Sequence, residues 1–294
     1  MKKQYKDGLW PLILPPFLLL AAITILPIIF TFVISLYYVD PTSPNPPQFQ
    51  GAFNYIALFS DSRFLNSLVV MVELIVFPVA LQIVIGLMLA IVLKEKLFGT
   101  RWMRLIFILP AVIPPAVSGL LWKLFIIPGA GGLTYMGSLV GADLQLDLLN
   151  LPLPALIVVI TASVWVGTPF VALLFLSALE TVGSEQYEAA TIDGASWVQS
   201  HWHISLPAIA PVITTVTVFR VLEALAVFPI IFMLTGGGPA GSTEPINYYA
   251  YVTGFEYLKI DYAATLIFFF FMIMMSFCAP FLVRIAWSAR RASA

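Results

Sequence analysis

The stretch from Glu188 to Pro207 reads EAATIDGASWVQSHWHISLP. It is polar and acidic, and it contains both histidines of the chain, His201 and His203. It lies in a chain of 294 residues, of which 61% are hydrophobic and only 10% are charged. Soluble domains carry about 25% charged residues. The composition therefore predicts a membrane protein in which this stretch is a polar insert between apolar segments.

Long apolar segments flank the insert on both sides. A helix needs about 20 mostly apolar residues to cross about 30 Å of hydrocarbon, and lipid offers the backbone no hydrogen-bonding partners outside the helix. Six segments qualify, so we predict an all-α polytopic membrane protein with one transmembrane domain over residues 1–294. The predicted transmembrane helices are residues 10–38, 65–93, 102–127, 155–179, 208–234 and 263–287. The first apolar run exceeds the apolar core of a signal peptide, about 7–15 residues, and is read as a retained helix.

The distribution of Lys and Arg predicts the orientation of these helices. Cytoplasmic connections carry an excess of positive charge. Positive residues gather before the first helix, in the second connection and at the C-terminus: Lys2, Lys3, Lys6, Lys94, Lys96, Arg101, Arg104, Arg284, Arg290 and Arg291. The first, third and fifth connections contain only Arg63 and Lys259. We therefore expect both termini in the cytoplasm. Loop 180–207 is then cytoplasmic by alternation, although it contains no Lys or Arg.

The local sequence of this loop predicts two short helices. Ser184 begins the first helix, which Glu185 supports by placing negative charge in the first turn. Gly194 ends it, because glycine adopts positive φ without strain. Ser196 is then placed to cap a second short helix. The residues alone leave two interpretations equally open: a solvated helix at the membrane surface, or a docking surface for another protein.

The spacing of residues in the loop resembles the signature loop of ABC importer permeases. The signature is Glu-Ala-Ala, three residues, Gly, nine residues and Ile-x-Leu-Pro, which here is Glu188-Ala189-Ala190, Gly194 and Ile204-Ser205-Leu206-Pro207. Two further motifs, Trp165-x-Gly167-x-Pro169-Phe170 and Leu234-Thr235-Gly236-Gly237-Gly238-Pro239, are similar to the carbohydrate-uptake, maltose-type branch. The similarity covers nearly the whole chain. It implies the type I permease fold and a sugar substrate.

The resemblance also implies partners. Such a permease sits in the bacterial cytoplasmic membrane beside a second related permease, with two ATPase subunits below and an extracytoplasmic solute-binding protein outside. Its loop forms a coupling helix that contacts the ATPase, here Glu185, Tyr187, Glu188, Ala189, Ala190, Asp193, Gly194, Ile204, Leu206 and Pro207. The chain has no P-loop motif, which would be GxxxxGK[ST] after a strand. We therefore expect no cofactor on this chain, and ATP and Mg on the partner ATPases.

Arg220 and Glu223 lie near the middle of the fifth predicted helix. Charge inside a membrane is unfavourable by about 2.5–3.5 kcal/mol on insertion scales, and it usually faces a cavity or a partner. Residues three apart share a helix face. The two side chains therefore either form a structural ion pair with each other, or Glu223 accepts hydrogen bonds from sugar hydroxyls while Arg220 positions it.

The resemblance adds residues to this substrate pathway. The sugar-contacting positions of the maltose-type subunit fall on Ser163, Gly167, Phe170, Glu223, Ala224 and Val227. Phe170 retains an aromatic ring on which a sugar can stack. Ala224 and Val227 depart from the maltose-type pattern, in which polar amides stand, so the resemblance does not identify the sugar.

Other classes of function fit the sequence less well. A net charge of −1 gives no general attraction to nucleic acid. The sequence contains no GxSxG or HExxH motif and no Cys/His cluster, which argues against an intramembrane enzyme and against a metal site. His201 and His203 are interpreted as polar residues of the docking surface. The alternative is a stand-alone secondary transporter or a channel. Secondary transporters often contain internal repeats, but this sequence shows no clear repeat, and the alternative leaves the loop unexplained.

Overall fold

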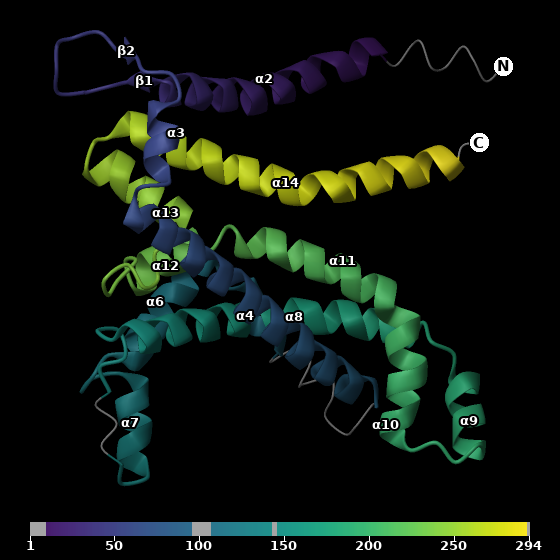
Figure 1. Cartoon of the computed structure of the whole chain (residues 1–294). Helices are drawn as coiled ribbons and strands as arrows, with labels where there is room; N and C mark the ends of the chain where they lie inside the picture. The colour runs from purple at the N-terminus through teal and green to yellow at the C-terminus, as the bar shows by residue number, and fades with distance from the viewer. Residues whose placement is uncertain (1–9, 96–106, 143–145, 293–294) are drawn as a thin grey trace. The chain divides into compact units, whose positions relative to one another are not determined.

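The computed structural model describes residues 10–95, 107–142 and 146–292, which are mostly helical (Figure 1). In chain order the elements are α2 (Trp10–Ser35), β1 (Tyr37–Tyr38), β2 (Gln48–Phe49), α3 (Phe53–Leu58), α4 (Ser62–Lys94), α6 (Pro115–Ile126), α7 (Gly132–Leu139), α8 (Pro152–Glu180), α9 (Ser184–Ile192), α10 (Trp197–Ser200), η1 (His201–Ser205), α11 (Leu206–Ala224), α12 (Phe228–Leu234), α13 (Ile246–Tyr251), η2 (Val252–Glu256) and α14 (Ile260–Ala292). Two compact units result. One contains residues 1–65 and 249–294, and the other contains residues 66–248.

The first unit joins the two ends of the chain. Helices α2 and α14 run side by side (Figure 1), with the Phe32 and Phe268 rings 4.7 Å apart. The Ser35 carbonyl accepts a long hydrogen bond of 3.4 Å from Thr265, and the Ser35 hydroxyl lies 2.6 Å from the Tyr55 hydroxyl of α3. Strands β1 and β2 pair antiparallel after α2. These contacts bring distant segments of the sequence together around one face of α14.

The second unit has its apolar core between α4, α8 and α11. Leu93 of α4, Phe175 and Leu179 of α8, and Ile209 of α11 are buried together there. A Cβ atom at Gly86 would collide with Val171, so glycine allows α4 and α8 to approach closely. Small residues at such contacts are typical of helices that pack inside membranes. This close packing places the polar residues of α4, α8 and α11 beside one another.

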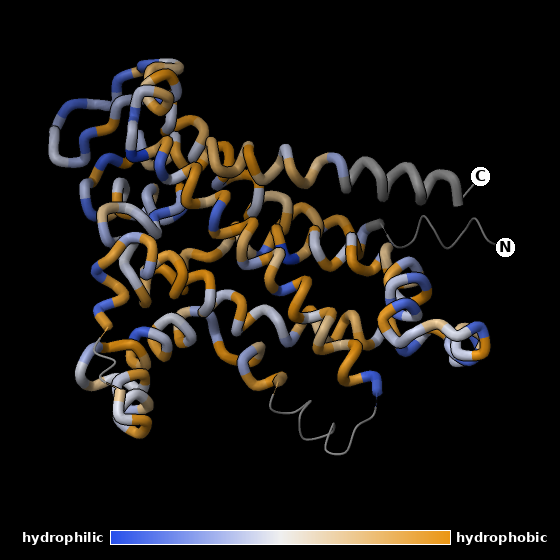
Figure 2. The backbone as a smooth tube through the Cα atoms, turned by 60° about the horizontal axis from the view of Figure 1, so that its bottom comes forward, coloured by the Kyte–Doolittle hydropathy of each residue, from blue (hydrophilic) through white to orange (hydrophobic). Residues whose placement is uncertain are grey.

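The outer faces of the long helices are apolar. Leu19 and Leu20 of α2 are 62% and 65% exposed, and hydrophobic residues predominate along the coloured parts of the long helices (Figure 2). Helices that are apolar all round need a hydrophobic environment. Within the described ranges, five helices are long and apolar enough to cross a membrane: Pro11–Ser35, Ser62–Lys94, Pro152–Glu180, Trp197–Ala224 and Ile260–Pro280. Helix α6 is a shorter apolar helix.

Two of the six predicted helices are interrupted in the structure. Residues 107–112 are helical, but the chain bends before α6, where Pro114 has an extended ψ of 140°. The first part of that prediction, from Trp102, lies outside the described residues. The predicted helix 208–234 is divided into α11 and α12. Pro229 lies in the first turn of α12. It has no backbone N–H, so it cannot continue the helical hydrogen bonds of α11. Asn247 donates a hydrogen bond of 3.1 Å to the Leu225 carbonyl freed by this break.

Candidate functional site

Arg220 is the centre of a polar cluster inside the second unit. Its Nε donates to Gln82 Oε1 of α4 at 2.9 Å, and its Nη1 pairs with Glu223 one turn further along α11. Gln82 Nε2 in turn donates to the Ser163 carbonyl of α8 at 2.9 Å. Arg220 is 9% exposed and Gln82 only 2%. The cluster thus connects three helices, and the buried guanidinium of Arg220 meets two oxygen acceptors, one from Gln82 and one from Glu223.

Gly167 leaves the space that this cluster occupies. A Cβ atom on Gly167 would collide with both the Arg220 guanidinium and the Gln82 amide. Glycine at this position of α8 is therefore required for the two side chains to meet. Among the pathway residues predicted from the sequence, Gly167 acts by making room for Arg220.

A cavity of about 270 Å³ opens beside the cluster. Its wall contains the carboxylate of Glu223 and the rings of Phe170 and Phe219, whose centroids are 5.7 Å apart. The side chain of Glu223 is 52% exposed, whereas the Arg220 side chain is 10% exposed. Glu223 therefore keeps free carboxylate surface although it pairs with Arg220. The lining residues include Leu74, Pro78, Gln82, Ser163, Phe170, Phe219, Arg220, Glu223, Ala224 and Val227.

The structure brings together all the residues that the sequence assigned to the substrate pathway. Six of them line the cavity: Ser163, Phe170, Arg220, Glu223, Ala224 and Val227. The seventh, Gly167, contacts two of the lining side chains. Gln82 and Phe219 were not predicted. Gln82 carries a signal that the sequence offered, since a polar amide in a predicted transmembrane helix usually has a specific partner.

Loop 180–207 folds as two short helical segments. Helix α9 spans Ser184–Ile192, and Gly194 follows with φ of +78°, as its position in the sequence predicts. Ser196 caps α10 in a reciprocal capping box with Gln199, which confirms the predicted second helix. The turn at Gly194 reverses the chain so that α10 and η1 return toward α11 (Figure 1). The N-cap of α9 is Gly183, without a side-chain cap.

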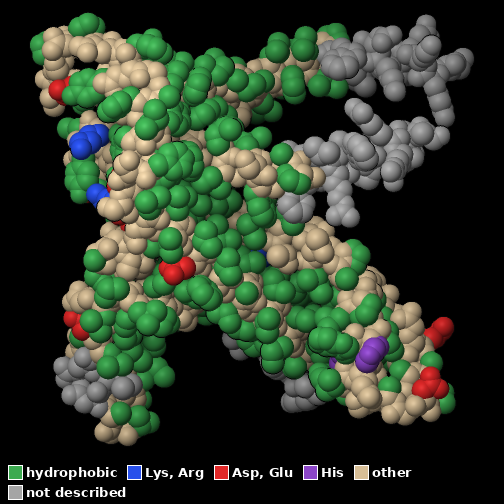
Figure 3. Space-filling view, viewed as in Figure 1, with side chains coloured by type: hydrophobic (Ala, Val, Ile, Leu, Met, Phe, Trp, Pro, Cys, Tyr) green, Lys and Arg blue, Asp and Glu red, His purple; other side chains and the backbone are tan. Residues whose placement is uncertain are grey.

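The predicted coupling residues divide into exposed and inward-facing ones. Glu185, Glu188, Ala189, Asp193, Gly194 and Pro207 are exposed, while Tyr187, Ala190, Ile204 and Leu206 are half-buried. The acidic side chains of this region protrude from one end of the second unit (Figure 3). Three large apolar side chains are exposed beside them, with Ile192 at 86%, Trp202 at 66% and Val198 at 65%. An exposed patch of this composition is typical of a protein contact surface.

Tyr187 and Trp197 fasten the loop to the end of α4. Lys94 Nζ donates to the Tyr187 hydroxyl at 2.9 Å, and this hydroxyl lies 2.8 Å from Ser205 Oγ. His201 Nδ1 lies 2.7 Å from the same Ser205 oxygen. Trp197 Nε1 donates to Glu95 Oε1 at 3.1 Å. The loop is therefore held to α4 by side chains from both of its helical segments.

This network corrects one interpretation of the histidines. The sequence placed both on the docking surface, but His201 is only 8% exposed and packs against the Trp197 ring at a centroid distance of 4.4 Å. The π-helical turn η1 directs His201 inward, toward Ser205. His203 is exposed, with Nδ1 3.0 Å from the Gln199 carbonyl. No group of His, Cys, Asp and Glu side chains suitable for a metal ion occurs in the described part of the chain.

Comparison with known proteins places this geometry in a family. Residues 82–291 match the family described as "Binding-protein-dependent transport system inner membrane component". The chain is 34% identical over 252 residues to the trehalose/maltose transport system permease protein MalF of Thermococcus litoralis, covering 85% of each chain. It is 31% identical over 274 residues to the sulfoquinovosyl glycerol transport system permease protein SmoG of Agrobacterium fabrum, covering 92% of this chain and 88% of that one.

A solved structure shares the fold. It is a chain of a bacterial alginate ABC transporter in complex with an alginate pentasaccharide-bound periplasmic protein, with a TM-score of 0.78 and 23% identity over 94% of this chain and 93% of that chain. The all-α permease fold predicted from the sequence is confirmed. The family match covers most of the chain and includes both the polar cluster and the loop. The chain therefore belongs to the family of binding-protein-dependent transport system inner membrane components and is a multi-pass membrane permease.

Proposed function

We propose that this chain is one permease subunit of an ATP-driven sugar importer and forms half of its translocation pathway. The observation that carries the proposal is the cavity that a half-exposed carboxylate, Glu223, and the aromatic ring of Phe170 both line. Sugars present hydroxyls to polar groups and apolar ring faces to aromatic ones, so this wall has both kinds of contact. Relatives whose names specify trehalose, maltose and sulfoquinovosyl glycerol support a saccharide or glycoside as the substrate.

The proposal includes the partners expected from the sequence. A second, related permease supplies the other half of the pathway, and an extracytoplasmic solute-binding protein delivers the sugar. Two ATPase subunits bind ATP and Mg, and this chain binds no cofactor. The exposed surface of α9 and α10, with Glu188 and Ile192, is the contact for one ATPase. The hydrogen bonds from Lys94 to Tyr187 and from Trp197 to Glu95 support this role, because a fastened loop can transmit a displacement.

The pathway assignment predicts a transport defect in Glu223→Gln. The amide keeps the size of the side chain but loses the negative charge that attracts hydroxyl donors and pairs with Arg220. A hydrogen bond to a charged group contributes about 1.5–3 kcal/mol, so we expect uptake to fall by roughly tenfold or its selectivity to change. The measurement is uptake of labelled sugars by vesicles that contain equal amounts of assembled complex. Normal uptake per complex, together with poor assembly, would instead assign the ion pair a purely structural role.

The orientation is a second testable part of the proposal. The positive charges predict that both termini lie in the cytoplasm and that the loop before β2 lies outside. Reporter fusions at Ala294 should be active only as cytoplasmic reporters, and fusions after Pro46 only as extracytoplasmic ones. The opposite activity at either position would contradict this orientation.

A further inference from the structure

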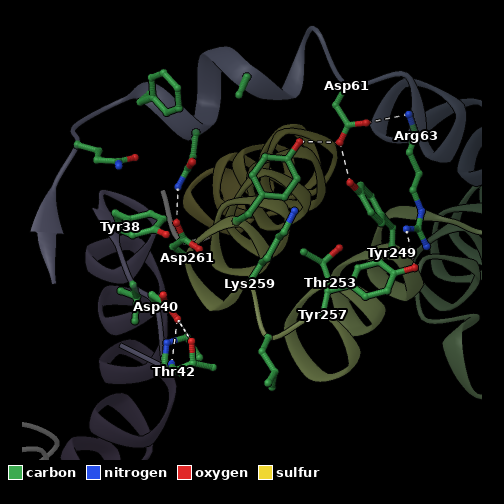
Figure 4. Close-up of a pocket in the computed structure, with 18 of the residues that line it drawn as sticks. Tyr38, Asp40, Thr42, Asp61, Arg63, Tyr249, Thr253, Tyr257, Lys259 and Asp261 are labelled. Atoms are coloured by element: carbon green, nitrogen blue, oxygen red, sulfur yellow. Dashed lines mark hydrogen bonds between the residues drawn. The ribbon is translucent and has the colours of Figure 1, made fainter. Parts of the chain in front are cut away.

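The first unit contains a second, larger cavity that the transport pathway does not use. It is open, has a volume of about 860 Å³ and lies between three segments of the unit (Figure 4). These segments are the residues after α2, the region of α3 up to Arg63, and the run from Tyr249 to Tyr262. The volume falls within the range of small-molecule sites, about 300–1,000 Å³. In the proposed orientation the cavity belongs to the extracytoplasmic connections.

Asp61 fixes the wall of this cavity. Its Oδ2 accepts hydrogen bonds from the Tyr249 and Tyr262 hydroxyls, each 2.7 Å long, and its Oδ1 accepts one of 2.9 Å from the Arg63 backbone N–H. Burial raises the pKa of Asp61, but these hydrogen bonds outweigh burial and hold the pKa below its ordinary value. The Arg63 guanidinium lies 4.6 Å from the centre of the Tyr249 ring. Asp61 is therefore ionised, and both of its carboxylate oxygens already accept hydrogen bonds. Through these bonds it positions the side chains around it.

Other lining groups are available to a ligand. Tyr257 is 55% exposed and presents its ring to the cavity (Figure 4). Lys259 is exposed, and its ammonium makes no ion pair with a described residue. Thr253, by contrast, is only 2% exposed, and its hydroxyl lies inside the wall near Tyr249, out of reach of a ligand.

The charged residues that line the cavity indicate which kind of ligand it can bind. Three carboxylates, Asp40, Asp61 and Asp261, stand against two cations, Arg63 and Lys259. A phosphate or carboxylate ligand would meet more negative than positive groups, and a purely apolar ligand would leave the polar groups unpaired. A neutral molecule with many hydroxyls can donate to Asp40 and Asp261 and accept from the Lys259 ammonium. Apolar ring faces on the same molecule fit the exposed tyrosine ring.

We propose that this cavity is a saccharide-binding site, separate from the cavity at Glu223, in which Tyr257 stacks on a sugar ring and Lys259 bonds its hydroxyls. The choice of a saccharide over other polyols rests on the proposed function. The site holds sugar at the extracytoplasmic face before it reaches the pathway. Asp261, 7% exposed and 3.5 Å from the Asn54 amide, offers an acceptor at the same wall.

The test is direct binding of trehalose, maltose and glucose to the complete transporter in nanodiscs, without solute-binding protein or ATP, by saturation-transfer NMR. At least one of these sugars should bind the unchanged complex. Lys259→Ala removes a charge-assisted hydrogen bond and should raise the dissociation constant about tenfold. Tyr257→Ala should weaken binding as well. Lys259 is exposed and has no ion pair with a described residue, so its change leaves the packing intact. Tyr257→Ala also removes a 3.4 Å hydrogen bond from Arg63, so Lys259→Ala is the cleaner of the two variants. The matched control is Phe255→Ala, which alters a 75% exposed aromatic residue of η2 that does not line the cavity and should bind normally.

Glu223→Gln separates the two cavities in the same experiment. Binding that is lost in Lys259→Ala but kept in Glu223→Gln supports the outer site. If none of the three sugars binds, or if only Glu223→Gln abolishes binding, the outer site is wrong even where uptake assays show sugar transport. If Tyr257→Ala and Lys259→Ala leave sugar binding unchanged and instead weaken co-purification of the solute-binding protein with the complex, the cavity is a protein contact and the saccharide proposal fails. Failure of sugar uptake by the unchanged transporter contradicts the proposed function itself.

Discussion

Replacing Gly194 with valine is expected to reduce transport and substrate-stimulated ATP hydrolysis by about five- to 150-fold while the complex still assembles. Gly194 has φ of +78° at the turn between α9 and α10, and nothing lies within 4 Å of a Cβ built there. The substitution therefore has space, and its effect arises from backbone strain alone. A β-branched residue in this conformation costs about 1–3 kcal/mol, which corresponds to that range of fold-changes if the strain distorts the docking surface. Uptake and hydrolysis are measured on reconstituted complexes at equal expression.

Gly183→Val is the matched control for this prediction. Gly183 lies in the same loop, also with no atom within 4 Å of its Cβ position, but its φ of −60° and ψ of 143° are ordinary for valine. We expect normal transport from it. A cysteine at the exposed Ala189, after replacement of the single native cysteine Cys278, should crosslink to an ATPase cysteine. Full coupled hydrolysis in Gly194→Val, with no crosslink from position 189, would show that the loop does not dock on the ATPase.

Arg220→Met is expected to have the largest effect on assembly. Arg220 is buried and bonds to Gln82 and Glu223, so its removal leaves a buried amide and a carboxylate without their cation. A buried polar group left without its partner costs about 1–3 kcal/mol, and the half-exposed Glu223 adds little because water reaches it. The yield of assembled complex should therefore fall by about five- to 150-fold. Size-exclusion chromatography of the purified complex, with its thermal stability, measures the loss.

Lys123→Met makes the same chemical change at the exposed end of α6 and should assemble normally. The double variant Gln82→Leu with Arg220→Met removes both members of the buried pair and should recover part of the assembly, because no amide is then left unpaired. It should not recover uptake, since Glu223 lacks its positioning partner. Normal yield and stability of Arg220→Met alone would contradict the buried cluster.

The sequence predicted the parts of the site that depend on local spacing. Arg220 and Glu223 are three residues apart, and one turn of helix brings them together. Gly194 and Ser196 have local conformational preferences that act in any context. The partner of Arg220 on α4 could not be located in this way. Gln82 is 138 residues away in the chain, and only the packing of α4 against α8 and α11 brings it close.

The fold, like the site, was predicted from the sequence only where local properties determine it. Apolar length predicted the long helices, because length and hydropathy are the properties that a bilayer selects. It missed the break between α11 and α12, where Pro229 interrupts a run that remains apolar throughout. It also missed the inward position of His201, since the π-turn η1 changes which face of the helix meets α4. Hydrophobicity determines that a segment is inserted, whereas the breaks depend on single residues and their distant partners.

The helical run from Trp197 to Ala224 works as a bent lever in the proposed importer. It contains α10, η1 and α11 without an intervening loop, and it bends near η1 (Figure 1). Its short arm carries the exposed Val198 and Trp202, and its long arm carries Arg220 and Glu223. A helix of 19 residues is about 28 Å long. A tilt of about 5° at the bend therefore moves the far end of α11 by roughly 2.5 Å, which is comparable to the length of the hydrogen bonds that hold Arg220.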